Sequence, residues 1–158
     1  MSKFSLIAMG GTFDIIHHGH ITLLSTAFDI SEKVIIGLTS DEFVQKKGKN
    51  PIHKYDERLK NLTSIIFKKF PNSYFEISQL NNDFGPAVFE KEVQALVVSD
   101  ETKNQGNILN KLRIERNLSP VEIIVVPMTL AKDGKRISTT RIKNSEIDSD
   151  GNLLPIDK

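Results

Sequence analysis

The chain of 158 residues has no cysteine, no long apolar run and no excess of charge of one sign. The missing cysteines exclude a disulfide framework, a thiolate metal site and a cysteine nucleophile. Its 21 Lys and Arg balance 20 Asp and Glu to a net charge of +1, so no broad basic surface is available for a nucleic-acid backbone. The opening apolar segment is too short for a signal peptide or a membrane span. We therefore expect a soluble cytoplasmic protein of one domain, with no nucleic-acid or membrane partner.

Apolar runs of strand length alternate with segments of helical periodicity along the whole chain. The five predicted strands are Phe4–Met9, Lys33–Leu38, Ser73–Ile77, Ala95–Ser99 and Glu122–Val126. Their continuous apolar character is typical of parallel strands covered on both faces. The alternation predicts an α/β fold: a doubly wound, Rossmann-like, five-stranded parallel sheet with helices on both faces, formed by residues 1–158 as a single domain.

Between the predicted strands, apolar residues recur at helical spacing. The repeats are Ile21, Leu24 and Phe28 in a first helix, and Leu59, Leu62 and Ile66 in a second. A third helix is predicted from about Glu101 to Arg116, with Ile108, Leu109 and Leu112 on its apolar side. A short helix is expected over Ser138–Lys143, and a polar tail follows from about residue 144. The segment 39–51 is predicted as a loop, and no surface stripe predicts an oligomeric state.

A glycine-rich loop, residues 10–20, connects the first predicted strand to the first predicted helix. Gly10 and Gly11 let the backbone approach a ligand, and the helix that follows offers unpaired N–H groups to an anion. His17 and His20 flank Gly19 and are expected to face one crevice, where charged or neutral imidazoles donate to phosphate oxygens. Structural zinc is the alternative, disfavoured because only three ligands and no thiolate are available.

Two motifs resemble the nucleotidyltransferase α/β phosphodiesterase superfamily. Gly11-Thr12-Phe13-Asp14, followed by His17-x-Gly19-His20, resembles its first signature, and Ile137-Ser138-Thr139-Thr140 resembles a second element near the carboxyl end. The resemblance implies nucleotidyl transfer from a nucleoside triphosphate to a phosphorylated acceptor, with release of pyrophosphate. Residues 132–136 depart from the R-T-x-G form usual in cytidylyltransferases, which disfavours that branch.

The middle of the chain resembles the archaeal and eukaryotic-type phosphopantetheine adenylyltransferases. The matching residues are Asp83–Ala87, Leu96–Thr102, Gly106, Asn110, Arg113, Leu118 and the segment 146–153. This resemblance implies adenylyl transfer from ATP to 4′-phosphopantetheine by direct in-line attack, giving dephospho-coenzyme A and pyrophosphate, with Mg²⁺ carried on the nucleotide. Other acceptors (FMN, nicotinamide mononucleotide or a polyol phosphate) are the alternative within the superfamily. A non-catalytic nucleotide sensor is the alternative from another class.

The resemblance also implies roles for individual residues. The expected catalytic residues are His20, His17 and Lys49, with Lys46 and Lys47 as alternatives to Lys49 because the register of the lysine-rich loop is open. The expected ATP contacts are Gly11, Thr12, Phe13, His17, His20, Ser99, Glu101, Thr102, Ile137, Ser138, Thr139 and Thr140. The expected acceptor contacts are Thr12, Asp14, Lys49 and Arg113, and no protein ligand to a metal is predicted.

Further expectations concern two other histidines and the end of the fourth predicted strand. His18 is predicted to be a dispensable spacer and His53 an ordinary loop residue. Residues 99–102 are expected to contact the adenine or ribose, and their sequence is also typical of a capping box that opens the third helix.

Overall fold

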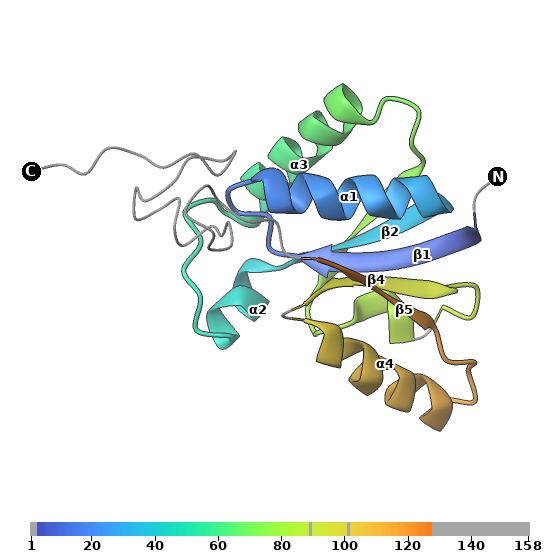
Figure 1. Ribbon diagram of the computed structural model, residues 1–158. Coiled ribbons are helices and arrows are strands. Elements are labelled where there is room, and N and C mark those ends of the chain that lie inside the picture. The colour runs from blue at the N-terminus through green and yellow to red at the C-terminus, as the bar shows by residue number, and fades with distance from the viewer. Residues whose placement is uncertain (1–2, 89, 101, 128–158) are drawn as a thin grey trace, which may run out of the picture.

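A computed structural model describes residues 3–88, 90–100 and 102–127, and its core is one parallel sheet (Figure 1). In chain order the elements are β1 (Phe4–Gly11), α1 (His18–Ile30), β2 (Ser31–Thr39), α2 (Asp41–Lys46), α3 (Tyr55–Lys69), β3 (Phe75–Leu80), the 3₁₀ helix η1 (Gly85–Val88), β4 (Ala95–Ser99), α4 (Lys103–Glu115) and β5 (Glu122–Val126). The strand order is β3-β2-β1-β4-β5, and every neighbouring pair is parallel. The predicted doubly wound fold is confirmed.

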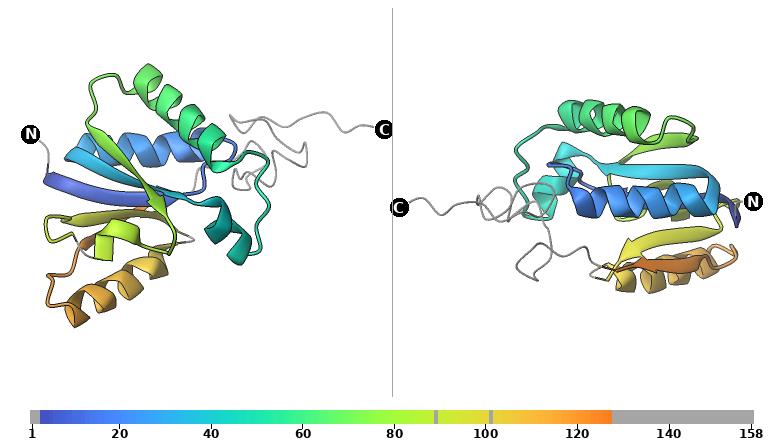
Figure 2. Two further views of the ribbon diagram at one scale, coloured as in Figure 1. Left: turned by 180° about the vertical axis from the view of Figure 1, so that it is seen from behind. Right: turned by 45° about the horizontal axis from the view of Figure 1, so that its top comes forward.

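Helices cover both faces of the sheet (Figure 2). Because successive side chains of a strand point to opposite faces, Ile7 of β1 belongs to one apolar cluster and its neighbour Ala8 to the other. Leu24 of α1 and Leu62 of α3 pack in the cluster with Ile7. Leu109 of α4 packs in the cluster with Ala8, together with residues of η1. The continuous apolar runs of the sequence thus have the predicted cause, burial on both faces.

The bounds of three strands and the exposure of one helical residue differ from the sequence-based expectation. Strands β4 and β5 have the predicted bounds, whereas β1 and β2 are longer and β3 begins and ends later. Helix α4 buries Leu109, but Ile108 is 50% exposed, so its predicted place on the apolar side is wrong. The predicted helix over Ser138–Lys143 and the tail from about residue 144 lie outside the described residues.

Two short elements were not predicted. Helix α2 interrupts the expected loop 39–51, and its N-cap Ser40 accepts a hydrogen bond from the Phe43 N–H at 3.1 Å. Asp41 and Glu42 lie in its first turn, where carboxylates favour the positive end of a helix. The other short element is η1, which follows β3. Both are too short to show an apolar period in the sequence.

The carboxyl ends of the central strands separate at the point where the strand order reverses. Strand β1 stays paired with β2 as far as Gly11 and Leu38. With β4 it pairs only at Ile7 and Ala8, although both strands continue beyond those residues. Open α/β sheets bind ligands at this position, outside the carboxyl ends of the strands. The loops that follow β1 and β4 therefore flank the expected binding region.

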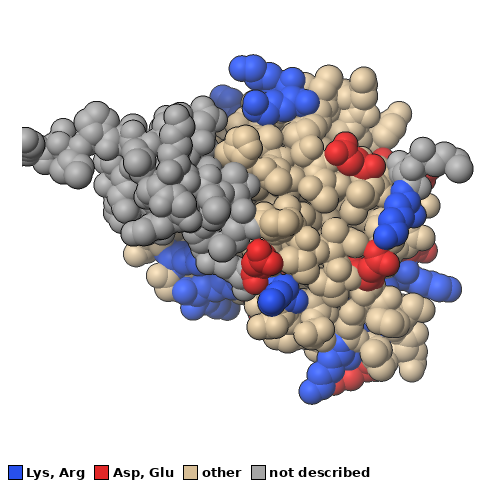
Figure 3. All heavy atoms as spheres, in the orientation of Figure 1, with Lys and Arg blue, Asp and Glu red and all other residues tan. Residues whose placement is uncertain are grey.

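No helix in the described part of the chain is long and apolar enough to cross a membrane. On the face drawn in Figure 3, Lys and Arg side chains are interspersed with Asp and Glu. This mixture agrees with the net charge of +1.

Candidate active site

Two histidines form the N-terminal cap of α1. Nδ1 of His17, the N-cap residue, accepts a hydrogen bond from the Gly19 N–H at 3.1 Å. Nδ1 of His20 accepts one from the His17 N–H at 3.2 Å, and the two rings stack with centroids 3.9 Å apart. A neutral imidazole whose Nδ1 accepts carries its proton on Nε2. The cap therefore fixes both rings as Nε2–H donors at the amino end of a helix.

His20 is neutral at physiological pH. Burial, reinforced by the neighbouring His17, lowers the pKa of His20 from 6.5 to about 3. Its ring also packs against Phe13, with centroids 5.0 Å apart. Of the two protonation states that the sequence left open, the structure thus favours the neutral donor for His20 in the free protein.

Phe13 has a left-handed backbone and a buried side chain. Its φ is +50°, which is uncommon for a bulky residue and typical of functional loops. The ring is 2% exposed and belongs to the apolar core, so only the backbone of Phe13 is available to a nucleotide. A Cβ on Gly11 would lie 3.0 Å from this ring, which explains the glycine there.

Asp14 fastens the first loop to the segment that precedes α3. Its side chain is 3% exposed, and its two oxygens accept from the N–H groups of Ile52 and His53, each at 2.9 Å. Nδ1 of His53 also lies 3.1 Å from Oδ1 of Asp14. The expectation that His53 is an ordinary loop residue is therefore wrong. Asp14, expected to contact the acceptor, has both carboxylate oxygens engaged by backbone N–H groups.

Arg58 lies at the centre of this loop cluster and was missed as a functional residue. Its side chain is fully buried. The guanidinium donates to the carbonyls of Thr12 (3.1 Å), Thr39 (2.8 Å) and His53 (3.1 Å) and to Oδ1 of Asp41 (3.0 Å). The sequence contains a pattern that indicates the burial of Arg58. Arg58 precedes the buried residues Leu62 and Ile66 at spacings of four, which places an arginine on the apolar stripe of its helix.

The three candidate lysines have different surroundings. Nζ of Lys47 lies 3.1 Å from a carboxylate oxygen of Asp83 and 4.8 Å from the centre of the Phe43 ring. Lys46 and Lys49 are exposed. The choice among the three lysines therefore stays a prediction, with Lys49 preferred.

The end of β4 makes a local turn. The Ser99 N–H donates to Oγ1 of Thr102 at 3.1 Å, and the two hydroxyl oxygens are 3.2 Å apart. Thr102 is the N-cap of α4, but its side chain makes no capping hydrogen bond. The predicted capping box over residues 99–102 is therefore wrong. Glu101 and Ile137–Thr140, expected to contact ATP, lie outside the described residues.

Arg113 does not reach the site. It is 1% exposed and donates to four backbone carbonyls, those of Ala87 (2.6 Å), Glu90 (2.9 Å), Val93 (3.4 Å) and Ser119 (2.8 Å). Val93 and Ser119 precede β4 and β5, so Arg113 lies at the amino edge of the sheet, opposite the first loop. The expected acceptor contact is wrong because α4 runs back across the sheet and carries its last turn away from the carboxyl edge.

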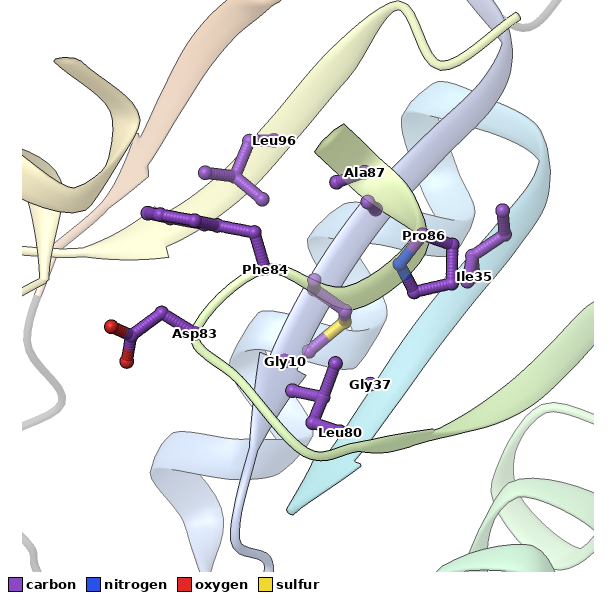
Figure 4. A pocket seen from close by; sticks show the side chains of 11 residues that line it. Gly10, Ile35, Gly37, Leu80, Asp83, Phe84, Pro86, Ala87 and Leu96 are labelled. Atoms are coloured by element: carbon purple, nitrogen blue, oxygen red, sulfur yellow. The ribbon is translucent and has the colours of Figure 1, made fainter. Parts of the chain in front are cut away.

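An apolar pocket lies between the sheet and the segment that connects β3 to β4 (Figure 4). Its floor includes Gly10 and Gly37, which are paired across β1 and β2. A Cβ on Gly37 would lie 2.6 Å from the Leu80 side chain, so the pocket depends on this glycine. Phe84 also lines the pocket, and the carboxylate of Asp83 at its rim turns away from it.

Among the described residues, no three His, Asp or Glu side chains gather as a metal-binding group. The polar groups of the first loop are imidazoles and backbone amides at a helix N-terminus, which suit an anion. Fold and loop together are typical of α/β proteins that bind a phosphate-bearing nucleotide.

The sequence matches the cytidylyltransferase-like family over residues 8–145, and the chain belongs to this family. Among its curated relatives, a protein named phosphopantetheine adenylyltransferase from Methanopyrus kandleri is 35% identical over 94% of this chain and 94% of its own length. One of the same name from Methanothermobacter thermautotrophicus is 40% identical over 96% of this chain and 91% of its own length. A solved protein of unknown function from Archaeoglobus fulgidus has a TM-score of 0.70 and 27% identity, covering 78% of this chain and 89% of that one.

Proposed function

We propose that this chain is a cytoplasmic enzyme that transfers the adenylyl group of ATP to 4′-phosphopantetheine, giving dephospho-coenzyme A and pyrophosphate. The observation that carries the proposal is the near full-length similarity to two archaeal proteins named phosphopantetheine adenylyltransferase. The pair of Nε2–H donors at the N-terminus of α1 supports it, because that arrangement suits a phosphate chain.

The acceptor phosphate needs no general base. The second pKa of a phosphate monoester is about 6, so at neutral pH its oxygens are already nucleophilic. Catalysis then requires positioning and relief of charge repulsion. We assign the orientation of the acceptor phosphate to Thr12, which directly follows β1 and whose hydroxyl lies 3.1 Å from that of Thr39.

We assign His20 to the phosphates around the reacting α-phosphorus and His17 to the rest of the triphosphate. A neutral Nε2–H donor stabilises charge that develops on the phosphate oxygens and does not itself lose a proton. The cap also holds each ring by its Nδ1, so the donors are oriented before the nucleotide arrives. Such preorganisation favours the transition state over the bound substrate.

Positive charge comes from the lysine-rich end of α2 and from a metal ion on the nucleotide. We assign the transition-state contact to Lys49, which is exposed and close in sequence to the segment held by Asp14. Mg²⁺ commonly binds through substrate phosphates and waters, and we expect it to be carried on the nucleotide. Bound there, it would neutralise part of the triphosphate charge.

The apolar pocket beneath residues 80–87 is our candidate for the pantetheine arm. Gly10 at its floor precedes Thr12 by two residues, so an acceptor held by its phosphate at Thr12 lies beside the pocket. The largely apolar lining suits the aliphatic part of the arm.

The test is to incubate the purified protein with ATP and Mg²⁺ and with each acceptor in turn, and to measure pyrophosphate. Release is expected with 4′-phosphopantetheine, together with a product of the mass of dephospho-coenzyme A. Release with FMN, nicotinamide mononucleotide or a polyol phosphate in its place would overturn the proposed acceptor. Tight ATP binding without turnover on any acceptor would favour the nucleotide sensor.

A further inference from the structure

We propose that Arg58 is a positioning residue, which holds the histidine-bearing first loop and the lysine-bearing second loop at one fixed separation. The inference rests on the proposed function, in which groups from both loops act on one phosphate chain. Arg58 belongs to α3 and is fully buried, so it acts through the backbone it binds.

The hydrogen bonds of Arg58 join segments that are distant in the sequence. Its NH1 group donates to the carbonyls of Thr12, in the loop after β1, and Thr39, the last residue of β2. Its NH2 group donates to Asp41, the first residue of α2, and its Nε to the carbonyl of His53. One rigid planar group therefore fixes the beginning and the end of the lysine-bearing segment against the first loop.

A second set of hydrogen bonds holds the same segments together, and its acceptors are the carboxylates of Asp14 and Asp41. Asp14 of the first loop accepts from the N–H groups of Ile52 and His53. Oδ1 of Asp41 accepts from the Tyr55 N–H at 2.9 Å as well as from Arg58. The segment 41–53 is thus held at both of its ends, and its lysines lie between the residues that Arg58 and Asp14 bind.

A structural role alone would predict a loss of stability and no specific loss of turnover. Arg113 allows a positioning role to be distinguished from a purely structural one. It is equally buried and also binds backbone carbonyls, but at the amino edge of the sheet. Lysine at either position retains the positive charge and loses the fork that binds several carbonyls at once. The pair Arg58→Lys and Arg113→Lys is therefore a matched comparison.

Both variants are expected to lower the urea midpoint. Only Arg58→Lys is expected to lower kcat as well, by about 100-fold, with a smaller change in KM for ATP, because misplacement of a loop affects the transition state most. Equal kcat values for the two variants at a temperature where both are folded would overturn the proposal.

Asp41 provides a second test that leaves the buried arginine in place. Its side chain is 44% exposed, so its replacement is compatible with folding. Asp41→Ala removes the acceptor for Arg58 NH2 and for the Tyr55 N–H, and kcat should fall. Asp41→Asn keeps an oxygen at Oδ1 and should recover much of the loss. Equal loss in the two variants would contradict positioning through this contact.

Hydrogen exchange separates this proposal from the proposed function, because it is measured on the free protein. Arg58→Lys should speed exchange at the amides of Ile52 and His53 and in residues 11–14 together, whereas Arg113→Lys should not. Unchanged protection at these amides in Arg58→Lys would overturn the role of Arg58. Absence of wild-type turnover with 4′-phosphopantetheine would instead overturn the proposed reaction and leave the exchange result standing.

Discussion

The neutral, partly buried His20 should make the folded protein sensitive to acid. The pKa of His20 is lowered from 6.5 to about 3 by burial and by His17. Between these values the unfolded chain binds a proton at this position and the folded protein does not. Acid therefore favours unfolding, and the stability lost in this window is recovered as the pH rises to 6.5.

The size of the effect follows from the width of the window. One pH unit corresponds to about 1.36 kcal/mol, so lowering the pH from 6.5 to 5 removes at most about 2 kcal/mol from the free energy of unfolding. Because the His20 ring is partly exposed, we expect about 1–2 kcal/mol. A loss of this size is a measurable part of the free energy of unfolding of a domain of ordinary stability.

The assay is urea unfolding followed by circular dichroism at pH 7 and pH 5, since the chain has no tryptophan. His20→Asn is the informative variant, because an amide oxygen replaces the Nδ1 acceptor and cannot titrate. Its stability should fall less between the two pH values than that of the wild type. His18→Asn, which removes an exposed imidazole from the same turn, should behave as the wild type does. An equal loss of free energy of unfolding in His20→Asn and the wild type would show that His20 does not cause the acid sensitivity.

Four further outcomes are expected. His20→Ala should lower kcat by about 10²–10³ and KM for ATP much less, because the lost donor acts on developing charge. Lys49→Ala should reduce kcat more strongly than ATP affinity, as measured by initial rates and equilibrium binding. Asp14→Ala should lower the free energy of unfolding by about 2–4 kcal/mol, since two backbone N–H groups lose their acceptor. Gly10→Ala, whose Cβ would lie 3.3 Å from Leu80, should raise KM for 4′-phosphopantetheine several-fold while KM for ATP stays the same.

Each of these outcomes has a result that contradicts it. Near-normal turnover of His20→Ala would remove that residue from the mechanism. A normal rate for Lys49→Ala, with a large loss for the same change at Lys47, would move the catalytic role within the loop. An unchanged urea midpoint for Asp14→Ala would show that its amide contacts contribute little. A parallel rise of both KM values in Gly10→Ala would argue against a separate place for the pantetheine arm.

Local pattern was sufficient to predict the elements that carry the fold. Strands β4 and β5 have the predicted bounds, and Leu24 and Phe28 of α1 and the apolar repeat of α3 pack in the core cluster. These features follow from periodicity, because a strand or helix buries the face that its own sequence makes apolar. Helix α2 was missed because six residues are too few for such a period, although Ser40 and the acidic first turn were visible as an N-terminal signal.

The hydrogen-bond partners of the buried charged side chains depend on the tertiary structure. From the sequence alone, Arg113 is expected to contact the substrate, and no role is expected for Arg58. In the structure the first binds carbonyls at the amino edge and the second joins the loops of the site. Asp14 likewise binds two N–H groups about forty residues away in the chain. A motif identifies which residues are present, but it does not say which distant backbone groups reach them.

Local pattern thus predicts the doubly wound sheet, the glycine-rich loop and the pair of histidines at a helix N-terminus. Local sequence can determine these because a strand, a turn and a helix cap are made from neighbouring residues. The burial that keeps His20 neutral, in contrast, depends on how the elements pack in the folded protein. The same packing joins the two loops through Arg58. Burial and long-range hydrogen bonding depend on how the elements pack, because the partners meet only when the chain has folded.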